Sequence, residues 1–176
     1  MERAKLSLLV IAAISSLAAC ETAVPDADTE APEVRLSISG PLIGREEMTN
    51  PPREEWLGEI GDQYLDLAAD ADYRFALTVS DQGGVSEAWL TLSNRLTVRE
   101  LTSPDIVNEA AGVNQLLTLR GSRSEARTGL SIGGVFRTPP GESILFRMEG
   151  SGSDFGGPSG SPNTRLVSVS VASGAR

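Results

Sequence analysis

The sequence predicts an all-β domain, a sandwich of two antiparallel sheets with about seven or eight short strands. Apolar residues recur with a period of two from Glu33 onward, and not with the period of 3.6 that a helix requires. The chain also holds 18 glycines and 10 prolines, which end strands in turns and interrupt helices. With 176 residues there is room for one ordinary domain, which we place at residues 34–172, with a short tail at 173–176.

Five segments alternate apolar and polar side chains, as strands do when one sheet face is buried and the other meets water. Their apolar residues form the predicted core: Val34, Leu36 and Ile38; Tyr73, Phe75, Leu77 and Val79; Ala88, Leu90 and Leu92; Ile144, Phe146 and Met148; Val167, Val169 and Val171. Weaker strand signals cover Leu96–Leu101, Gln115–Arg120 and Gly129–Phe136.

The connection formed by residues 40–72 is too long to lack structure of its own in a compact domain. Asn50-Pro51 followed by Glu54-Glu55 is typical of a helix start, with Asn as the N-cap and Pro at the first helical position. The apolar side of that helix would carry Trp56, Leu57 and Ile60. We expect the helix to cap the open end of the sandwich; the alternative is that it docks a partner.

Two stretches resemble a known family. Tyr73–Val85 reads Tyr-Arg-Phe-Ala-Leu-Thr-Val-Ser-Asp-Gln-Gly-Gly-Val and is followed by Ala88-Trp-Leu-Thr-Leu92. This region resembles strands B and C of bacterial immunoglobulin-like surface domains, and Phe146–Val171 is similar to their F and G strands. The sequence departs from the family in its long A–B connection and its F–G loop rich in Gly, Ser and Pro. The resemblance implies an immunoglobulin-like β-sandwich, here with a partly helical A–B connection.

Residues 1–19 have the form of a secretion signal. A basic start is followed by the apolar run Leu6–Ala19, which is too short to span a bilayer comfortably. The run closes on Leu17-Ala18-Ala19-Cys20, which resembles the lipobox of bacterial lipoproteins. The resemblance implies cleavage before Cys20, followed by acylation of its sulfur and its new α-amine. An ordinary signal peptide with an accidental cysteine is the alternative. Each buried methylene adds about 0.8 kcal/mol, so two or three acyl chains anchor a protein stably.

Residues 20–33 are predicted to form an acidic flexible tether behind the lipidated cysteine. The stretch after Cys20 holds acidic residues and prolines but no basic residue, so it cannot bury enough apolar surface to fold. In lipoprotein families with a sorting rule, Asp after the cysteine favours the inner membrane. The residue here is Glu21, which favours the outer membrane of a bacterial envelope.

Charge and composition restrict the function. The net charge is −9, and removal of residues 1–19 would take away Arg3 and Lys5 against Glu2, which leaves −10. Such a chain repels phosphate backbones, so nucleic-acid binding is not expected. The sequence has no His, and Lys5 is its only lysine, so after removal of residues 1–19 the chain would have neither the usual general base nor a lysine for Schiff-base chemistry. We therefore expect a non-catalytic protein without a cofactor.

One turn pattern occurs twice. Ser80-Asp81-Gln82-Gly83-Gly84 and Ser153-Asp154-Phe155-Gly156-Gly157 would form the B–C and F–G loops, which meet at one end of a sandwich. Asp81 and Asp154 could together bind Ca²⁺, a cation that prefers oxygen ligands. The simpler interpretation is that each Asp caps its own turn and the glycines supply positive φ.

Other reactive patterns are weaker. Gly129-Leu130-Ser131-Ile132-Gly133 matches the G-x-S-x-G string of serine hydrolases, but that motif needs a His and a strand–turn–helix elbow. Glu46-Glu47 and Glu54-Glu55 could be imagined as glycosidase acids, although such acids must face each other across a cleft. A carboxylate-based hydrolase is therefore the last of three function hypotheses.

Trp56 and Trp89 are the candidate binding surface. Trp89 falls on the strand face opposite Ala88 and Leu90, where an aromatic ring can stack on a sugar or anchor a protein contact. The first hypothesis is a membrane-anchored module that binds an envelope protein, with Trp56 at the end away from the tether. The second is a carbohydrate-binding module for cell-surface glycan.

Overall fold

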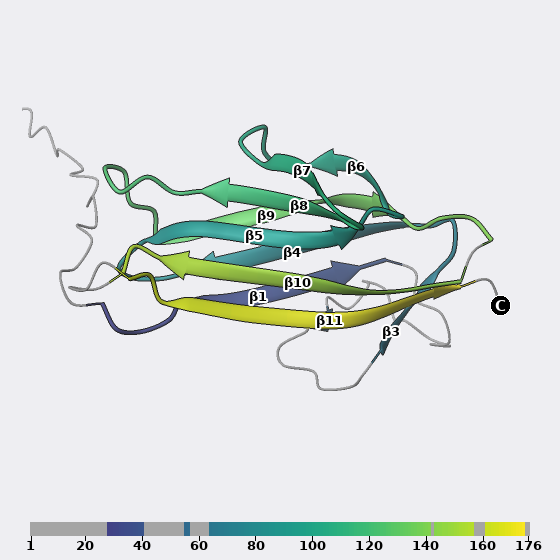
Figure 1. The fold of residues 1–176 in the computed structure, drawn as a ribbon, viewed down its shortest axis with the longest axis horizontal. Coiled ribbons are helices and arrows are strands. Elements are labelled where there is room, and N and C mark those ends of the chain that lie inside the picture. Colours follow the sequence, from purple (N-terminus) through teal and green to yellow (C-terminus); the bar gives the residue numbers. More distant parts are fainter. Residues whose placement is uncertain (1–27, 41–54, 57–63, 142, 157–160, 175–176) are drawn as a thin grey trace, which may run out of the picture.

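The computed structural model describes residues 28–40, 55–56, 64–141, 143–156 and 161–174. In these residues, eleven strands form two sheets that pack face to face (Figure 1). The predicted all-β sandwich is therefore confirmed, with more strands than expected. Within the described ranges, no helix has the length and apolar character needed to cross a membrane.

The two sheets differ in size. The first has the strand order β2-β1-β4-β9-β6, formed by β1 (Glu33–Ser39), β2 (Glu55–Trp56), β4 (Asp72–Ser80), β6 (Thr97–Leu101) and β9 (Gly129–Arg137). The second has the order β3-β11-β10-β5-β8-β7, formed by β3 (Tyr64–Ala68), β5 (Val85–Ser93), β7 (Val107–Ala111), β8 (Asn114–Arg120), β10 (Ile144–Asp154) and β11 (Thr164–Gly174). Neighbouring strands are antiparallel, except that β3 runs parallel to β11.

The core lies between the two sheets and consists of the residues that alternation predicts. Tyr73, Leu77 and Leu90 are completely or almost completely buried, as are Met148 and Val171. The strands that carry these residues thus turn one apolar row inward and a second row outward.

Aromatic contacts add to this packing, since both Tyr73 and Phe75 lie against Phe136. The Tyr73 ring stacks on Phe136 with 5.7 Å between ring centroids. Its hydroxyl accepts a hydrogen bond of 2.6 Å from the backbone N–H of Ala68. The buried hydroxyl is therefore satisfied, and it ties the end of β3 to β4.

Small residues in β10 let the two sheets approach closely. Gly150 and Gly152 are buried, and both face the opposite sheet. A Cβ on Gly152 would lie 2.2 Å from Cγ1 of Val79, and a Cβ on Gly150 would lie 2.5 Å from Cδ1 of Leu77. These positions are therefore filled by side chains of β4, and no larger residue fits without displacing them.

The helix expected in the A–B connection is not observed. Glu55–Trp56 form β2, which pairs with β1 through Ser37 and Ile38, so the expected helix is wrong at these two residues. The cap signal at Asn50-Pro51 is local, whereas the free edge of β1 offers backbone partners across the sheet. Residues 41–54 and 57–63, including Asn50, Leu57 and Ile60, lie outside the described residues.

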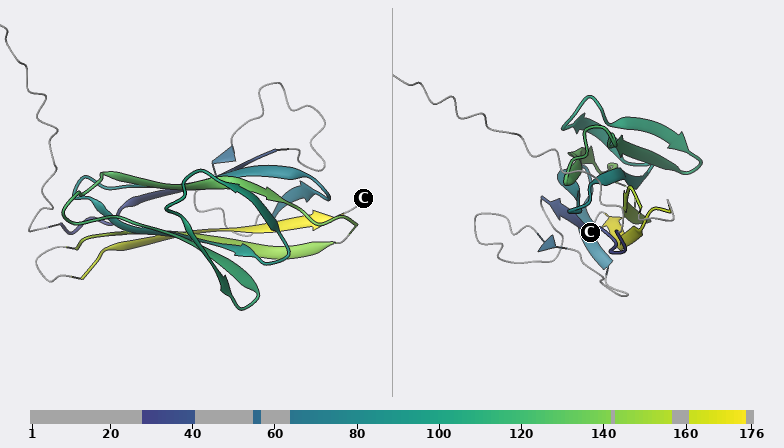
Figure 2. Two further views of the ribbon diagram at one scale, coloured as in Figure 1. Left: turned by 90° about the horizontal axis from the view of Figure 1, so that it is seen from above. Right: turned by 90° about the vertical axis from the view of Figure 1, so that its left-hand side faces the viewer.

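The β7–β8 hairpin extends away from the layered strands (Figure 2). Its two-residue loop is Gly112-Val113, and Gly112 has a φ of 65°. Glycine at the first loop position with positive φ is what a tight type II′ turn requires. The turn is fixed to the sandwich because the Asn94 N–H donates to the Val113 carbonyl at 3.0 Å.

Candidate functional site

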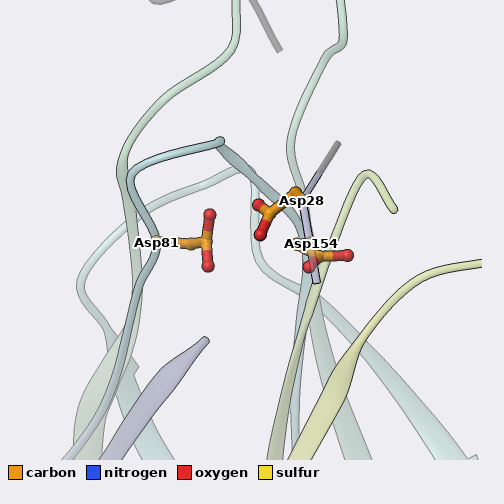
Figure 3. A group of neighbouring side chains, drawn as sticks. All are labelled: Asp28, Asp81 and Asp154. Carbon is orange, nitrogen blue, oxygen red and sulfur yellow. The ribbon is translucent and has the colours of Figure 1, made fainter. Parts of the chain in front are cut away.

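Three carboxylates gather at the end of the sandwich where β1 begins (Figure 3). Glu33 at the start of β1 pairs with Ser80 at the end of β4, so the residue before β1 and the turn after β4 lie together. Asp28 therefore approaches Asp81, and Asp154 joins them from the end of β10. One carboxylate oxygen from each residue lies within 4.8 Å of the others. The predicted meeting of the Asp81 and Asp154 turns is thus observed, with Asp28 added.

Asp154 is the buried member of this cluster. The register between β10 and β5 shifts between Ser153 and Asp154, and such a bulge re-aims a side chain. Asp154 is 0% exposed. Its Oδ1 accepts from the backbone N–H of Gly156 at 2.7 Å and from that of Asn163 at 2.8 Å. Its Oδ2 accepts from the Asn163 amide at 2.6 Å. The carboxylate therefore links Gly156, just after β10, to Asn163, just before β11.

Asp81 caps the turn between β4 and β5. Its Oδ1 accepts from the backbone N–H of Gly83 at 2.7 Å, the side-chain turn expected for an Asp-x-Gly sequence. Burial raises the pKa of Asp81, the Gly83 N–H opposes the rise, and the nearby Asp28 and Asp154 carboxylates add to it. Burial and the two neighbouring carboxylates therefore both disfavour the ionised form of Asp81.

Asp28 and Asn163 connect the segment before β1 to the loop before β11. The Asn163 amide donates to Asp154 and also to the backbone carbonyl of Asp28 at 3.2 Å. This contact joins positions 135 residues apart. Sequence reasoning assigned Asp28 to the tether and did not single out Asn163, because no local pattern signals a contact of that range.

The cluster could hold a cation, but its donor set is incomplete for calcium. Ca²⁺ takes six to eight oxygen ligands, and the described residues bring three carboxylates together. All three already accept a backbone N–H bond from the residue two positions further along the chain. The turn-capping role is thus observed, and calcium binding stays an untested alternative to it.

A second candidate site surrounds Trp89, which lies on the outward face of β5 and is partly buried. An open hollow of about 700 Å³ is lined by Trp89 and Thr91 of β5, Leu116 and Thr118 of β8, and Val107 of β7. Charged side chains also line it: Glu87, Asp105, Glu109, Arg120, Glu125 and Arg127. An aromatic ring beside hydroxyls and carboxylates is an arrangement that suits a polar ligand with apolar faces.

The remaining predicted residues are placed as follows. Ser131 of the G-x-S-x-G string lies within β9, opposite Thr78 of β4, and its neighbours continue the regular ladder, so the string forms no elbow. Trp56 is placed only by its backbone in β2, and its role at a binding surface stays a prediction. Cys20, Glu46, Glu47 and Glu54 lie outside the described residues.

A comparison with models of known protein families found no match, and neither did a comparison with curated protein sequences.

Proposed function

We propose that this chain is a non-catalytic lipoprotein of the bacterial envelope whose β-sandwich binds another envelope protein. The observation that carries the proposal is the string Leu17-Ala18-Ala19-Cys20 at the end of an apolar run of signal-peptide length. Cys20 is also the only cysteine, so its thiol has no partner within the chain for a disulfide. Lipid on this residue would make the membrane the first partner, with the outer membrane favoured by Glu21.

The position of Asp28 supports a role as a tethered module. Asp28 lies eight residues after Cys20 and contacts the end of the sandwich formed by the Asp81 and Asp154 turns. A chain anchored at Cys20 would therefore hold that end toward the membrane. The opposite end, and the β7–β8 turn that lies there beside Asn94, would face the envelope space.

The strand order supports an immunoglobulin-like arrangement as the finer description of the fold. In that arrangement strands A, B, E and D form one sheet and strands G, F and C the other. Here β1-β4-β9-β6 has the order A-B-E-D, and β11-β10-β5 has the order G-F-C. The β7–β8 hairpin extends the second sheet next to β5, on the side where variable-type domains carry added strands. In variable-type domains of this architecture, the loops at one end of the sandwich form the binding surface.

The proposal is tested by photo-crosslinking in intact cells. A photoreactive amino acid is placed at exposed positions of the sandwich, one position in each strain, and the captured protein is identified by mass spectrometry. We expect one dominant protein from positions at one surface, and loss of that capture when Cys20→Ser releases the chain from the membrane. Capture spread equally over all positions, or unchanged by Cys20→Ser, would contradict a tethered interaction module.

The Trp89 hollow favours one alternative, a module that binds cell-surface glycan. A pyranose ring could stack on Trp89 while Thr118 meets one of its hydroxyls. This alternative predicts saturable binding of cell-wall or capsular oligosaccharides, and a loss of about tenfold or more in affinity in Trp89→Ala. Thr78→Ala, at an exposed position of the first sheet, is the matched control.

A further inference from the structure

The free edge of β7 carries an inference that rests on the proposed function and makes it specific. We propose that β7 is the docking edge of the module, where an extended basic segment of the partner protein pairs as an added strand. Backbone hydrogen bonds would supply much of the affinity, and the side chains that line the neighbouring hollow would supply selectivity.

The four sheet edges in the described part of the chain differ in how far they resist strand addition. β2 has only two residues, and β3 is a short parallel strand with Asp66 exposed. β6 carries Arg99 and Glu100, and its register shifts between Val98 and Glu100. Short length, charge and bulges are the usual protections of an edge strand.

β7 is as short as β3 and β6, at five residues, but it has neither a bulge nor adjacent charged residues. All five of its residues are exposed, and its register with β8 is regular from end to end. It contains no proline and a single charged residue, Glu109. An open edge of this kind either aggregates or serves a partner.

The hairpin geometry tells which backbone groups face outward. With a two-residue turn, the closing pair Ala111–Asn114 is hydrogen-bonded, and bonded and non-bonded pairs alternate from there. Asn108 and Ala110 therefore direct their N–H and C=O groups away from β8. These groups are available to an added strand without the loss of any bond within the hairpin.

The hairpin is also held in place before any partner arrives. The Gln115 amide donates to the carbonyls of Leu96 at 2.9 Å and Ser93 at 3.3 Å, and Asn94 bonds to the turn. A preformed edge loses little conformational entropy on binding.

The charged side chains around the hollow indicate what kind of segment binds beside β7. Acidic side chains outnumber the two arginines around the hollow, and Arg120 is already paired with Glu87 at 3.0 Å. The outward row of β7 presents Val107, Glu109 and Ala111 to this hollow. An added strand with lysine or arginine at alternate positions would place its cations beside Glu109 and the other carboxylates.

A second copy of the chain fits this edge less well. Antiparallel pairing of β7 with its own copy, centred on the strand, would place Glu109 opposite Glu109. Each chain also carries a net charge of −9 before any processing, so two copies repel each other. The observations therefore favour a basic partner strand over self-association.

The test uses the lipidated full-length mature protein in neutral detergent micelles, with three synthetic nine-residue peptides as probes. One alternates lysine with valine, one alternates glutamate with valine, and one repeats the lysine peptide with proline at its centre. Amide hydrogen exchange is followed by NMR. We expect the lysine peptide alone to slow exchange at Asn108 and Ala110 by about tenfold or more at saturation. Equal binding of the lysine and glutamate peptides would overturn the charge assignment.

A matched pair of variants at one position tests strand addition itself. Ala110→Pro removes an N–H that points away from β8, so the hairpin keeps its internal bonds. Ala110→Val keeps that N–H and adds only side-chain bulk. We expect Ala110→Pro to weaken binding of the lysine peptide by about tenfold or more and Ala110→Val to retain it. Equal binding by the two variants, both with wild-type melting temperatures, would overturn the proposal.

Further readouts separate this inference from the proposed function. Glu109→Lys is expected to bind the glutamate peptide more tightly than the lysine peptide.

A partner captured in cells from a surface other than β7 would support the interaction module and contradict β7 as its docking edge. Sedimentation that shows concentration-dependent dimers lost in Ala110→Pro would assign the edge to a second copy. Oligosaccharide binding that depends on Trp89, with no peptide binding, would overturn both proposals in favour of the glycan module.

Discussion

Asn163→Ala offers the sharpest test of how the acidic end of the sandwich is built. The wild-type amide donates to the fully buried Oδ2 of Asp154 at 2.6 Å and to the carbonyl of Asp28 at 3.2 Å. Alanine removes both bonds. It keeps the backbone N–H that donates to Oδ1. The substitution therefore leaves one oxygen of a buried carboxylate without its donor and releases the segment before β1.

The size of the effect follows from these contacts. A hydrogen bond to a charged group contributes about 1.5–3 kcal/mol, and the cost is larger when the remaining partner stays buried. We expect the free energy of unfolding to fall by about 2 kcal/mol, which lowers the melting temperature by about 6 °C in a domain of this size. The assay is thermal unfolding of residues 20–176 with Cys20→Ser, followed by circular dichroism.

The control is Gln82→Ala, because Gln82 is exposed in the neighbouring turn. Surface substitutions of this kind change stability by less than about 0.5 kcal/mol. If Asn163→Ala is as mild as Gln82→Ala, the Asn163 bridge does not hold the two loops together, and the description of this end is wrong.

Three more predictions concern the same protein. The pKa of Asp81 in the folded state is raised above its ordinary value of 3.8, so the folded chain binds this proton more tightly than the unfolded chain does, and the stability that the proton contributes is lost as pH rises through the raised pKa. Asp81→Asn should therefore be more stable than wild type at pH 7, and its free energy of unfolding should depend less on pH in denaturant titrations. Calcium should not be needed for folding, so the melting temperature should be the same in calcium chloride and in EDTA. A melting temperature that rises to a plateau with added calcium, and no longer rises in Asp154→Asn, would make the cluster a calcium site. Gly152→Ala should destabilise the sandwich by about 1–3 kcal/mol because its Cβ would lie 2.2 Å from Val79, while Gly129→Ala, whose nearest neighbour is 3.6 Å away, should be nearly neutral in the same unfolding assay.

The sandwich could be predicted because its central strands bury one face only. β4 alternates Tyr73, Phe75, Leu77 and Val79 with polar or small residues, so burial and sequence carry the same period. β7 could not be predicted in this way, because it is exposed on both faces and Val-Asn-Glu-Ala-Ala has no apolar row. β2 was missed because a local helix-cap signal competes with an edge pairing that only the folded sheet provides.

The candidate site was predictable to the extent that its signals are local. Asp81 and Asp154 lie in repeated Ser-Asp-x-Gly-Gly turns, and the strand assignments place both turns at one end. Asp28 and Asn163 have no such pattern, since their contact depends on how β1 and β11 enter the sandwich. The hollow beside Trp89 likewise requires the β7–β8 hairpin, which the sequence alone did not indicate.

The central claim, that this is a lipid-anchored envelope protein, is tested most directly by the mass of its N-terminal peptide. The chain is purified from bacterial membranes, digested and examined by mass spectrometry. We predict a peptide that begins at Cys20 and carries a diacylglyceryl group on sulfur and an acyl group on the α-amine. A peptide that still contains residues 1–19, or one that begins at Cys20 with a free thiol and a free amine, would contradict the account.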